Sequence, residues 1–336
     1  MVRFTSLGDL ILTTPFFREV KSIFPEAKVD FLTSDTFASL FTSNPHINEL
    51  FTFDRKADSE ELNRWASQIK AEKYDLVFDL HRSLRSRLLL LKALGPLASS
   101  HIGINKRSLK RNLLLSFGWD WFTEPEPQRL AYLEPLKRFG SDHQLDGHTE
   151  LFPSPEDHRV VKDILREKQI EDKPLVCLGP SASFGLKCWP QDRFLKLGIA
   201  LYERGFQPVS LGASADPEPP YLEQASDGKI INLAGKFSFL QSAAFLSVAQ
   251  LAISNDSAVV HFSEAVGTPA LAIFGPTVPQ FGYGPFLPNS ELIEHPVGCR
   301  PCSRNGKGDC KNQQGQVCME EISVEQVLGS AIKRLT

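Results

Sequence analysis

Two successive series of alternating strands and helices predict an α/β protein with two parallel sheets. The predicted strands lie at 29–32, 50–53 and 76–78 in the first series and at 175–179, 208–211, 251–253 and 270–274 in the second. Alternation of this kind is typical of parallel strands covered by helices. Residues 140–155 between the two series are polar, contain two glycines and two prolines, and lack periodicity. They are predicted to be an interdomain linker.

Composition restricts the class of protein. The chain has 336 residues, of which 42% are hydrophobic and 23% charged, and its net charge is -3. That length suffices for two domains, and the slightly acidic balance argues against a general nucleic-acid binder. No run approaches the roughly 18 apolar residues of a membrane span, and the start of the sequence lacks the pattern of a signal peptide. We therefore expect the protein to stay in the cytoplasm.

The first loop carries a carboxylate. Residues 2–4, Val2-Arg3-Phe4, form a very short candidate strand, and Gly8 permits a turn before the helical pattern that starts near Leu10. Asp9 therefore falls in a strand-to-helix loop, at the sheet edge where α/β proteins place their chemistry. Two readings remain open, a functional carboxylate and a helix cap.

A strand-turn-helix-strand unit spans residues 251–279. The cluster at 254–257 is predicted to be a turn that starts a helix, and Gly267-Thr268-Pro269 ends it. A helix start at the carboxyl end of a parallel strand is a natural seat for phosphate, while the alternative is an ordinary turn. Neither G-x-G-x-x-G nor G-x-x-x-x-G-K-[ST] occurs in the sequence.

Lys187 is the best candidate for a cation beside such a phosphate. It lies in a loop rich in Ser and Gly that follows the strand predicted at 175–179, and Pro190 is placed for the first turn of the next helix. We expect this loop to leave the same sheet edge as the 254–257 turn.

A basic segment extends from Leu80 to Trp119. It contains no Asp or Glu, and its eight cations are Arg82, Arg85, Arg87, Lys92, Lys106, Arg107, Lys110 and Arg111. A leucine run at 88–91 lies among these cations, and a second run at 113–115 with Trp119 and Trp121 follows them. This pairing suits an anionic, amphiphilic partner at a membrane surface, whereas the alternative is a core of leucines beneath a solvated cationic face.

Four of the six cysteines, Cys299, Cys302, Cys310 and Cys318, lie close together in the sequence. This is not the pattern of a small secreted disulfide scaffold. Four thiolates in a Gly-rich loop could enclose structural zinc, and the alternative is reduced or redox-active thiols.

Several motifs together resemble glycosyltransferase family 9, whose best-known members are the ADP-heptose:lipopolysaccharide heptosyltransferases. The matching stretches are 3–9 with 13–15, 75–80 with Ser83 and Ser86, 187–190, 255–261 and 274–279. The resemblance implies a GT-B fold, in which two Rossmann-like domains with parallel sheets face a central cleft. It also implies donor contacts from the C-terminal half and acceptor contacts from the N-terminal half.

The resemblance further implies roles for individual residues. Asp9 matches the catalytic carboxylate. The implied donor-binding residues are Ser181, Lys187, Asp256, Ser257, Ala258, His261 and Thr277. The implied acceptor-binding residues are Ser6, Gly8, Arg82, Arg85, Arg107 and Lys110. Ala258 replaces a usual glycine, and the first strand is a few residues shorter than the family pattern, which leaves open a start further upstream.

The expected domains are residues 1–150 for the acceptor, 151–320 for the nucleotide sugar, and 321–336 as a helix that crosses back to the N-terminal domain. The expected reaction is inverting transfer of a heptose from ADP-heptose to the anionic inner core of lipopolysaccharide, at the cytoplasmic face of the inner membrane. The cysteines favour the heptosyltransferase II type. No D-x-D occurs in the sequence, so no metal is expected in catalysis. Alternatives are another nucleotide sugar, a nucleotide-sugar epimerase, and a non-catalytic binding protein.

Overall fold

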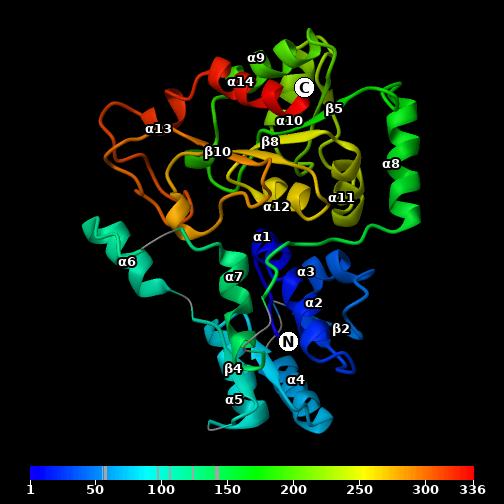
Figure 1. Ribbon diagram of the computed structural model, residues 1–336, viewed down its shortest axis with the longest axis vertical. Helices are drawn as coiled ribbons and strands as arrows, with labels where there is room; N and C mark the ends of the chain where they lie inside the picture. Colours follow the sequence, from blue (N-terminus) through cyan, green and yellow to red (C-terminus); the bar gives the residue numbers. More distant parts are fainter. Residues whose placement is uncertain (55, 57–58, 97, 106, 123–124, 141–143) are drawn as a thin grey trace. The chain divides into compact units, whose positions relative to one another are not determined.

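The computed structural model describes residues 1–54, 56, 59–96, 98–105, 107–122, 125–140 and 144–336. The chain forms two compact units (Figure 1), which we call the first and the second unit. The first unit comprises residues 1–107 and 128–151, and the second comprises 108–127 and 152–336. Lys106 of the basic segment lies outside the described residues.

The predicted 1–150 domain is wrong for residues 108–127, because this segment belongs to the second unit. The reason is packing: Leu114 and Phe122 form a cluster with Val278 and Phe281 of that unit. Arg111 also donates a hydrogen bond from Nη2 to the backbone oxygen of Phe281 at 3.0 Å. A long-range contact of this kind leaves no local signal in the sequence.

The sheet of the first unit is parallel throughout. Its strands are β1 (Asp30–Ser34), β2 (Glu49–Phe53), β3 (Val77–Asp79) and β4 (His101–Gly103). β1 pairs with β2, and β3 pairs with β4. Val2 bridges Leu32 and Asp79, both in parallel, so the first residues of the chain lie between β1 and β3. Residues 2–4 are therefore central, and Val2, Arg3 and Phe4 are all buried there.

The helical segments of the first unit are α1 (Leu7–Ile11), α2 (Thr14–Ile23), α3 (Asp35–Ala38), η1 (Ser39–Phe41), α4 (Ser59–Glu72), α5 (Leu84–Leu94), α7 (Gln128–Leu133) and η2 (Glu134–Arg138). Pro15 lies in the first turn of α2, where it needs no backbone N–H donor. Ser83 and Ser86 form a capping box at the start of α5. Trp65 of α4 packs in one core with Leu89 and Leu90 of α5.

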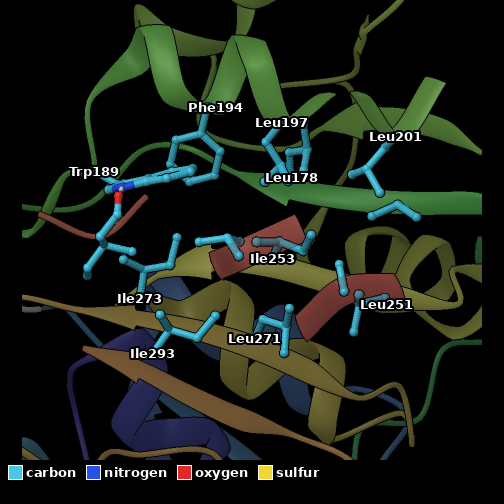
Figure 2. Packing of buried hydrophobic residues seen from close by; sticks show 14 of the residues in the cluster. Leu178, Trp189, Phe194, Leu197, Leu201, Leu251, Ile253, Leu271, Ile273 and Ile293 are labelled. Atoms are coloured by element: carbon cyan, nitrogen blue, oxygen red, sulfur yellow. Dashed lines mark hydrogen bonds between the residues drawn. The ribbon is translucent and has the colours of Figure 1, made fainter. Parts of the chain in front are cut away.

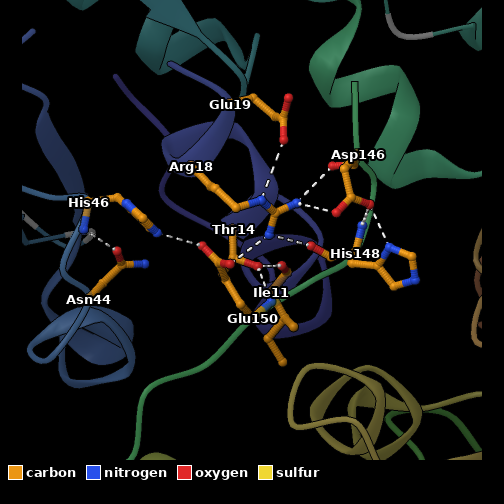
Figure 3. A network of polar contacts seen from close by, with 9 residues as sticks. All are labelled: Ile11, Thr14, Arg18, Glu19, Asn44, His46, Asp146, His148 and Glu150. Atoms are coloured by element: carbon orange, nitrogen blue, oxygen red, sulfur yellow. Dashed lines mark hydrogen bonds and ion pairs between the residues drawn. The ribbon is translucent and has the colours of Figure 1, made fainter. Parts of the chain in front are cut away.

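The predicted linker is tied to the first unit along part of its length (Figure 3). Arg18 of α2 donates from Nη1 to Glu150 Oε2 at 2.6 Å and from Nη2 to the backbone oxygen of Asp146 at 2.9 Å. The backbone N–H of Glu150 donates to Thr14 Oγ1 at 2.9 Å. Burial alone would lower the pKa of Arg18, but the hydrogen bond with Glu150 and the negative charges of Glu150, Asp146 and Glu19 together outweigh it and raise this pKa. The chain thus leaves the first unit only after Leu151.

The second unit contains a six-stranded parallel sheet in the order β10-β9-β8-β5-β6-β7. Its strands are β5 (Leu175–Gly179), β6 (Gln207–Ser210), β7 (Ile231–Asn232), β8 (Leu251–Asn255), β9 (Ala270–Phe274) and β10 (Glu291–Glu294). β5, β8 and β9 are buried along their whole length, as continuous apolar runs in parallel sheets usually are.

Helices cover both faces of this sheet, with α9, α10 and α14 on one side and α8, α11 and α12 on the other (Figure 1). The helical segments are α6 (Ser108–Phe117), α8 (Pro155–Glu167), η3 (Gly185–Lys187), α9 (Gln191–Tyr202), α10 (Glu218–Ala225), α11 (Phe239–Val248), α12 (Ala258–Glu264), η4 (Pro279–Phe281), α13 (Val317–Glu320) and α14 (Val324–Leu335). Figure 2 shows the core on the α9 side, where Trp189 and Phe194 pack above Ile253 and Ile273.

The final helix does not follow the prediction that it crosses back to the N-terminal domain. α14 packs against α9, β8 and β9 of the second unit. Val327 and Ala331 on its apolar face are fully buried in that core. The amphipathic pattern predicted the helix but could not identify the surface that it covers. None of the helices in the described parts of the chain has the length and apolar character needed to cross a membrane.

Candidate functional site

Each unit has its own topological switch point, and the motifs that the sequence analysis identified lie at these two points. In the second unit the chain passes from β5 outward to β6 and β7, then returns to β8 beside β5 and continues to β9 and β10. The loops after β5 and β8 therefore leave neighbouring strands in opposite directions, which is where open α/β sheets bind ligands. In the first unit the segment at Val2 and its neighbour β3 stand in the same relation.

Lys187, Asp256 and Thr277 meet at the switch point of the second unit. Lys187 Nζ lies 2.7 Å from Asp256 Oδ2 and donates to the Asp256 backbone oxygen at 3.3 Å. Thr277 Oγ1 donates to the same Oδ2 at 2.7 Å. The Lys187 and Asp256 side chains retain 15% and 11% exposure. We call these three residues the lysine cluster; all three are among the predicted donor-binding residues.

Asn255 and Trp189 hold the two loops of this cluster together. Asn255 Oδ1 accepts from the backbone N–H of Trp189 at 2.9 Å, and its Nδ2 donates to the backbone oxygen of Pro180 at 2.6 Å. Trp189 is buried, and its ring N–H donates to the backbone oxygen of Ile322 at 2.9 Å. These residues therefore position Lys187 from behind, a role that sequence reasoning did not assign to Asn255.

The remaining predicted donor residues take separate places. Ser257 caps α12: its hydroxyl accepts from Val259 N–H at 3.3 Å, and Ala258 is the first residue of the helix. His261, within α12, is buried. Ser181 Oγ donates to Glu218 Oε2 at 2.8 Å, which adds a carboxylate that the sequence did not single out.

In the first unit, Asp9 lies on α1 and receives contacts from the side chains of Tyr132, Ser6 and Arg3. Tyr132 Oη donates to Oδ1 at 2.5 Å, Ser6 Oγ donates to Oδ2 at 2.8 Å, and Arg3 Nη2 lies 3.1 Å from Oδ2. Arg3 also lies over the Tyr132 ring, 4.6 Å from its centroid, and donates to the backbone oxygen of Leu80. The Asp9 side chain keeps 18% exposure. It is thus an oriented carboxylate that solvent still reaches.

Asp79 organises the neighbouring loop. It is fully buried at the end of β3, and its Oδ1 accepts from the backbone N–H groups of His81 at 3.0 Å and Arg82 at 2.7 Å. Its Oδ2 accepts from Ser86 Oγ at 3.0 Å. A buried carboxylate with these donors fixes the loop that follows β3 and the start of α5.

A pocket of about 230 Å³ opens beside this loop; it is lined by Phe4, Thr5, Phe53, His81, Ser83 and Arg85. Of the predicted acceptor-binding cations, Arg85 reaches this pocket. Arg82 instead donates from Nη1 to the backbone oxygen of Ile104 at 2.5 Å. Arg107 ends the first segment of the first unit, and Lys110 lies on α6 in the second unit, 5.6 Å from the centre of the Phe122 ring.

The cysteine-rich loop contacts the lysine cluster. A Cβ at Gly306 would lie 2.6 Å from Lys187 Cγ, so only glycine allows this approach. Gln316 Nε2 donates to the backbone oxygen of Leu186 at 2.6 Å, and the Cys302 N–H donates to the backbone oxygen of Pro276 at 3.2 Å. The loop therefore supports Lys187 and the segment before Thr277.

The six cysteines are free thiols. Burial is the main cause that raises the pKa of Cys318 to about 11, and the nearby Cys302 contributes to the same shift. Burial is also the main cause that raises the pKa of Cys302, and Cys299 contributes to that shift. Within the described ranges, His, Cys, Asp and Glu side chains form no group of three or more that could hold a metal ion. A structural zinc held by these four cysteines therefore stays a prediction.

Comparison with known proteins identifies the family of this chain. The family model described as glycosyltransferase family 9 (heptosyltransferase) matches residues 62–311. Lipopolysaccharide heptosyltransferase 3 of Escherichia coli K12 is 30% identical over 281 residues, covering 80% of this chain and 80% of the relative. Lipopolysaccharide heptosyltransferase 2 of Salmonella typhimurium is 24% identical over 288 residues, covering 82% of each chain.

A solved structure has the same fold over the whole chain. The crystal structure of the family 9 glycosyltransferase from Veillonella parvula has a TM-score of 0.82 at 22% identity, and the match covers 99% of this chain and 95% of that chain. The likeness confirms the predicted GT-B fold of two Rossmann-like domains. Since a heptosyltransferase 3 matches at higher identity than a heptosyltransferase 2, assignment to type II stays a prediction.

Proposed function

Because the chain belongs to glycosyltransferase family 9, the heptosyltransferases, we propose that it moves a heptose from ADP-heptose to the inner core of lipopolysaccharide. Membership makes it a glycosyltransferase, and its relatives are heptosyltransferases of lipopolysaccharide synthesis. The observation that carries the proposal is the solvent-accessible carboxylate of Asp9, held by three donors at the carboxyl edge of its sheet.

The lysine cluster supports a diphosphate-linked donor. Lys187 is paired with one carboxylate, Asp256, and remains partly exposed, so a bound diphosphate can share its charge. The leaving diphosphate gains negative charge as the sugar departs, and a positioned cation stabilises that charge more in the transition state than in the ground state. The N–H groups at the start of α12, beside Ser257 and Ala258, would add further donors.

Asp9 would act as the general base. In a direct displacement, the acceptor oxygen bonds to the anomeric carbon while the bond from that carbon to the phosphate oxygen breaks, and the configuration inverts. The acceptor's hydroxyl proton passes to Asp9, and ADP leaves with the electrons of the broken bond. Tyr132, Ser6 and Arg3 keep the carboxylate oriented, and Gly8 precedes it within α1 rather than in the turn that the sequence predicted.

The acceptor would be anionic and would bind through the pocket beside Ser83 and Arg85. Arg82, Arg107 and Lys110 extend the positive charge along the sequence. Such cations suit the phosphates and carboxylates of a lipopolysaccharide core. The proposed reaction would take place at the cytoplasmic face of the inner membrane. The reaction would need no metal, since Lys187 supplies the positive charge at the diphosphate.

The test is release of ADP from ADP-heptose, measured with and without a deacylated lipopolysaccharide core, beside a panel of other nucleotide sugars. We expect ADP release and a heptosylated core only when donor and acceptor are both present. Conversion of the donor without any acceptor would instead identify an epimerase. Donor binding without turnover would identify a binding protein.

A further inference from the structure

Helix α5 of the first unit exposes a stripe of leucines. Leu84, Leu88 and Leu91 are 86%, 42% and 49% exposed, although leucine is among the residues most often buried. Their spacing of four and three residues places them on one face of the helix. The opposite face, with Leu89, Leu90 and Ala93, is buried in the core of the unit. The leucine stripe is therefore not needed to hold α5 in place.

Cations flank the leucine stripe on both sides. At roughly 100° per residue, Arg87 falls on one side of the three leucines, and Arg85 and Lys92 fall on the other. All three cations are exposed. No Asp or Glu occurs between Leu80 and Trp119, although the whole chain has a net charge of -3. An apolar stripe between two rows of cations is the pattern of a helix that lies in the surface of an anionic bilayer.

The second unit carries an exposed apolar and aromatic surface on a separate segment. Leu109 of α6 is 67% exposed, and Phe117, Trp119 and Trp121 are each more than half exposed. The rings of Phe117 and Trp119 lie 5.2 Å apart, so they form one aromatic patch. Tryptophan is enriched at membrane interfaces because its ring is apolar and its N–H is polar.

We propose that α5 and the 109–121 segment each bind the surface of a lipid bilayer that contains anionic lipids. The proposal rests on the proposed function for its biological meaning, because a transferase acting on a lipid-anchored acceptor gains from binding the surface that presents the acceptor. α5 begins at Ser83 and Arg85, which line the acceptor pocket. A lipid-bound α5 would therefore hold the pocket at the level of the headgroups.

Charge argues against a second copy of this chain as the occupant. Two leucine stripes that met face to face would bring Arg85, Arg87 and Lys92 against the same cations of the other copy. Like charges in contact are destabilising, and the stripe carries no carboxylate to compensate them. Anionic headgroups would instead neutralise both rows while the leucines enter the acyl boundary.

The experiment is flotation of the full chain with vesicles of phosphatidylethanolamine and phosphatidylglycerol, compared with vesicles of phosphatidylcholine alone. We expect binding to the anionic vesicles, which weakens as salt is raised. The Leu84→Ser/Leu88→Ser/Leu91→Ser variant should lose about tenfold or more in partitioning. Arg87→Gln/Lys92→Gln should lose about fivefold per charge at low salt and little at high salt.

The matched control replaces three exposed apolar residues elsewhere, Tyr202→Ser/Tyr221→Ser/Val248→Ser, and should bind like the wild type. For the second segment, brominated lipid should quench the fluorescence of Trp119 and Trp121, since the other two tryptophans, Trp65 and Trp189, are buried. Wild-type partitioning of the leucine variant would overturn the assignment of α5. Loss of a dimer, rather than of vesicle binding, would identify a second copy as the occupant.

Comparing two acceptors distinguishes failure of the membrane proposal from failure of the proposed function. The leucine variant should keep wild-type turnover with a deacylated acceptor and lose turnover only with an acceptor embedded in vesicles. Vesicle binding by a wild-type protein that transfers to neither acceptor would leave the lipid face standing and would contradict the proposed function alone.

Discussion

Tyr132 donates a hydrogen bond to Oδ1 of Asp9 at 2.5 Å, across 123 residues of sequence. Tyr132 lies on α7, which belongs to the segment that returns to the first unit after residue 127. The same phenol ring supports the guanidinium of Arg3, which itself pairs with Asp9. The proposed base is therefore held from a distant part of the chain, and Tyr132 is a positioning residue.

Replacing Tyr132 should affect turnover more than binding. A hydrogen bond to a charged group contributes about 1.5–3 kcal/mol, so Tyr132→Phe should lower kcat roughly ten- to hundredfold while the donor KM stays within a few-fold. Steady-state kinetics checks this. The control is Tyr74→Phe, which removes a phenol hydrogen bond to Asp30 at 2.7 Å in the same unit. Equal kinetics for the two variants would remove Tyr132 from the site.

Lys187→Ala should weaken donor binding and slow transfer together. Loss of one positioned donor to a developing negative charge typically costs about 10² to 10³ in rate. Titration calorimetry with ADP and steady-state kinetics measure the two effects. The matched control is Lys196→Ala, because Lys196 pairs with Asp192 at 3.1 Å on an exposed face. Unchanged kinetics at saturating acceptor would exclude Lys187 from the donor site.

The cations at Arg107 and Lys110 should steer the anionic acceptor. Reversing both to Glu should raise the KM for the acceptor, more at low salt than at high salt, because exposed charges are screened beyond roughly 10 Å at 0.1 M. Donor affinity should stay the same. Kinetics at two salt concentrations checks the prediction, and an equal change for donor and acceptor would indicate misfolding instead.

The cysteines should behave as reduced thiols of unequal reactivity. Cys310 is exposed, whereas Cys318 is buried with its pKa raised to about 11, so few Cys318 thiolates exist at pH 8. Labelling with a thiol reagent should modify Cys310 quickly and Cys318 only on unfolding. Elemental analysis of protein purified without chelator tests the alternative that the four cysteines bind zinc. Stoichiometric zinc that is lost when two of the four cysteines are replaced would show the metal site instead.

The local pattern of apolar residues predicted much of the fold, because strands and helices each have a characteristic short-range periodicity. The buried strand at 270–274 has the bounds that its apolar run predicts. The expectation that the loops after β5 and β8 share a sheet edge is confirmed by the Lys187–Asp256 pair. Parallel strands enforce this, since their carboxyl ends lie on one edge.

Long-range packing could not be read in the same way. The 108–127 segment joins the second unit through Leu114 and Phe122, and α14 stays on its own unit through Val327. Each side chain is an ordinary apolar residue whose partner is far away in the sequence. The sequence analysis did not predict a role for Tyr132 because no motif surrounds it. Only the folded chain brings it to Asp9.

The most direct test of the account is the turnover of Asp9→Asn. The amide keeps the size of the side chain and can still hydrogen-bond, but it cannot accept the acceptor's proton. Removing a positioned base typically costs about 10² to 10⁴ in rate, whereas losing a helix cap costs only about 1 kcal/mol of stability. We predict that Asp9→Asn folds, binds ADP-heptose nearly as the wild type does, and loses kcat by that factor with the deacylated acceptor. Near-wild-type kcat would contradict the assignment of Asp9 as the general base.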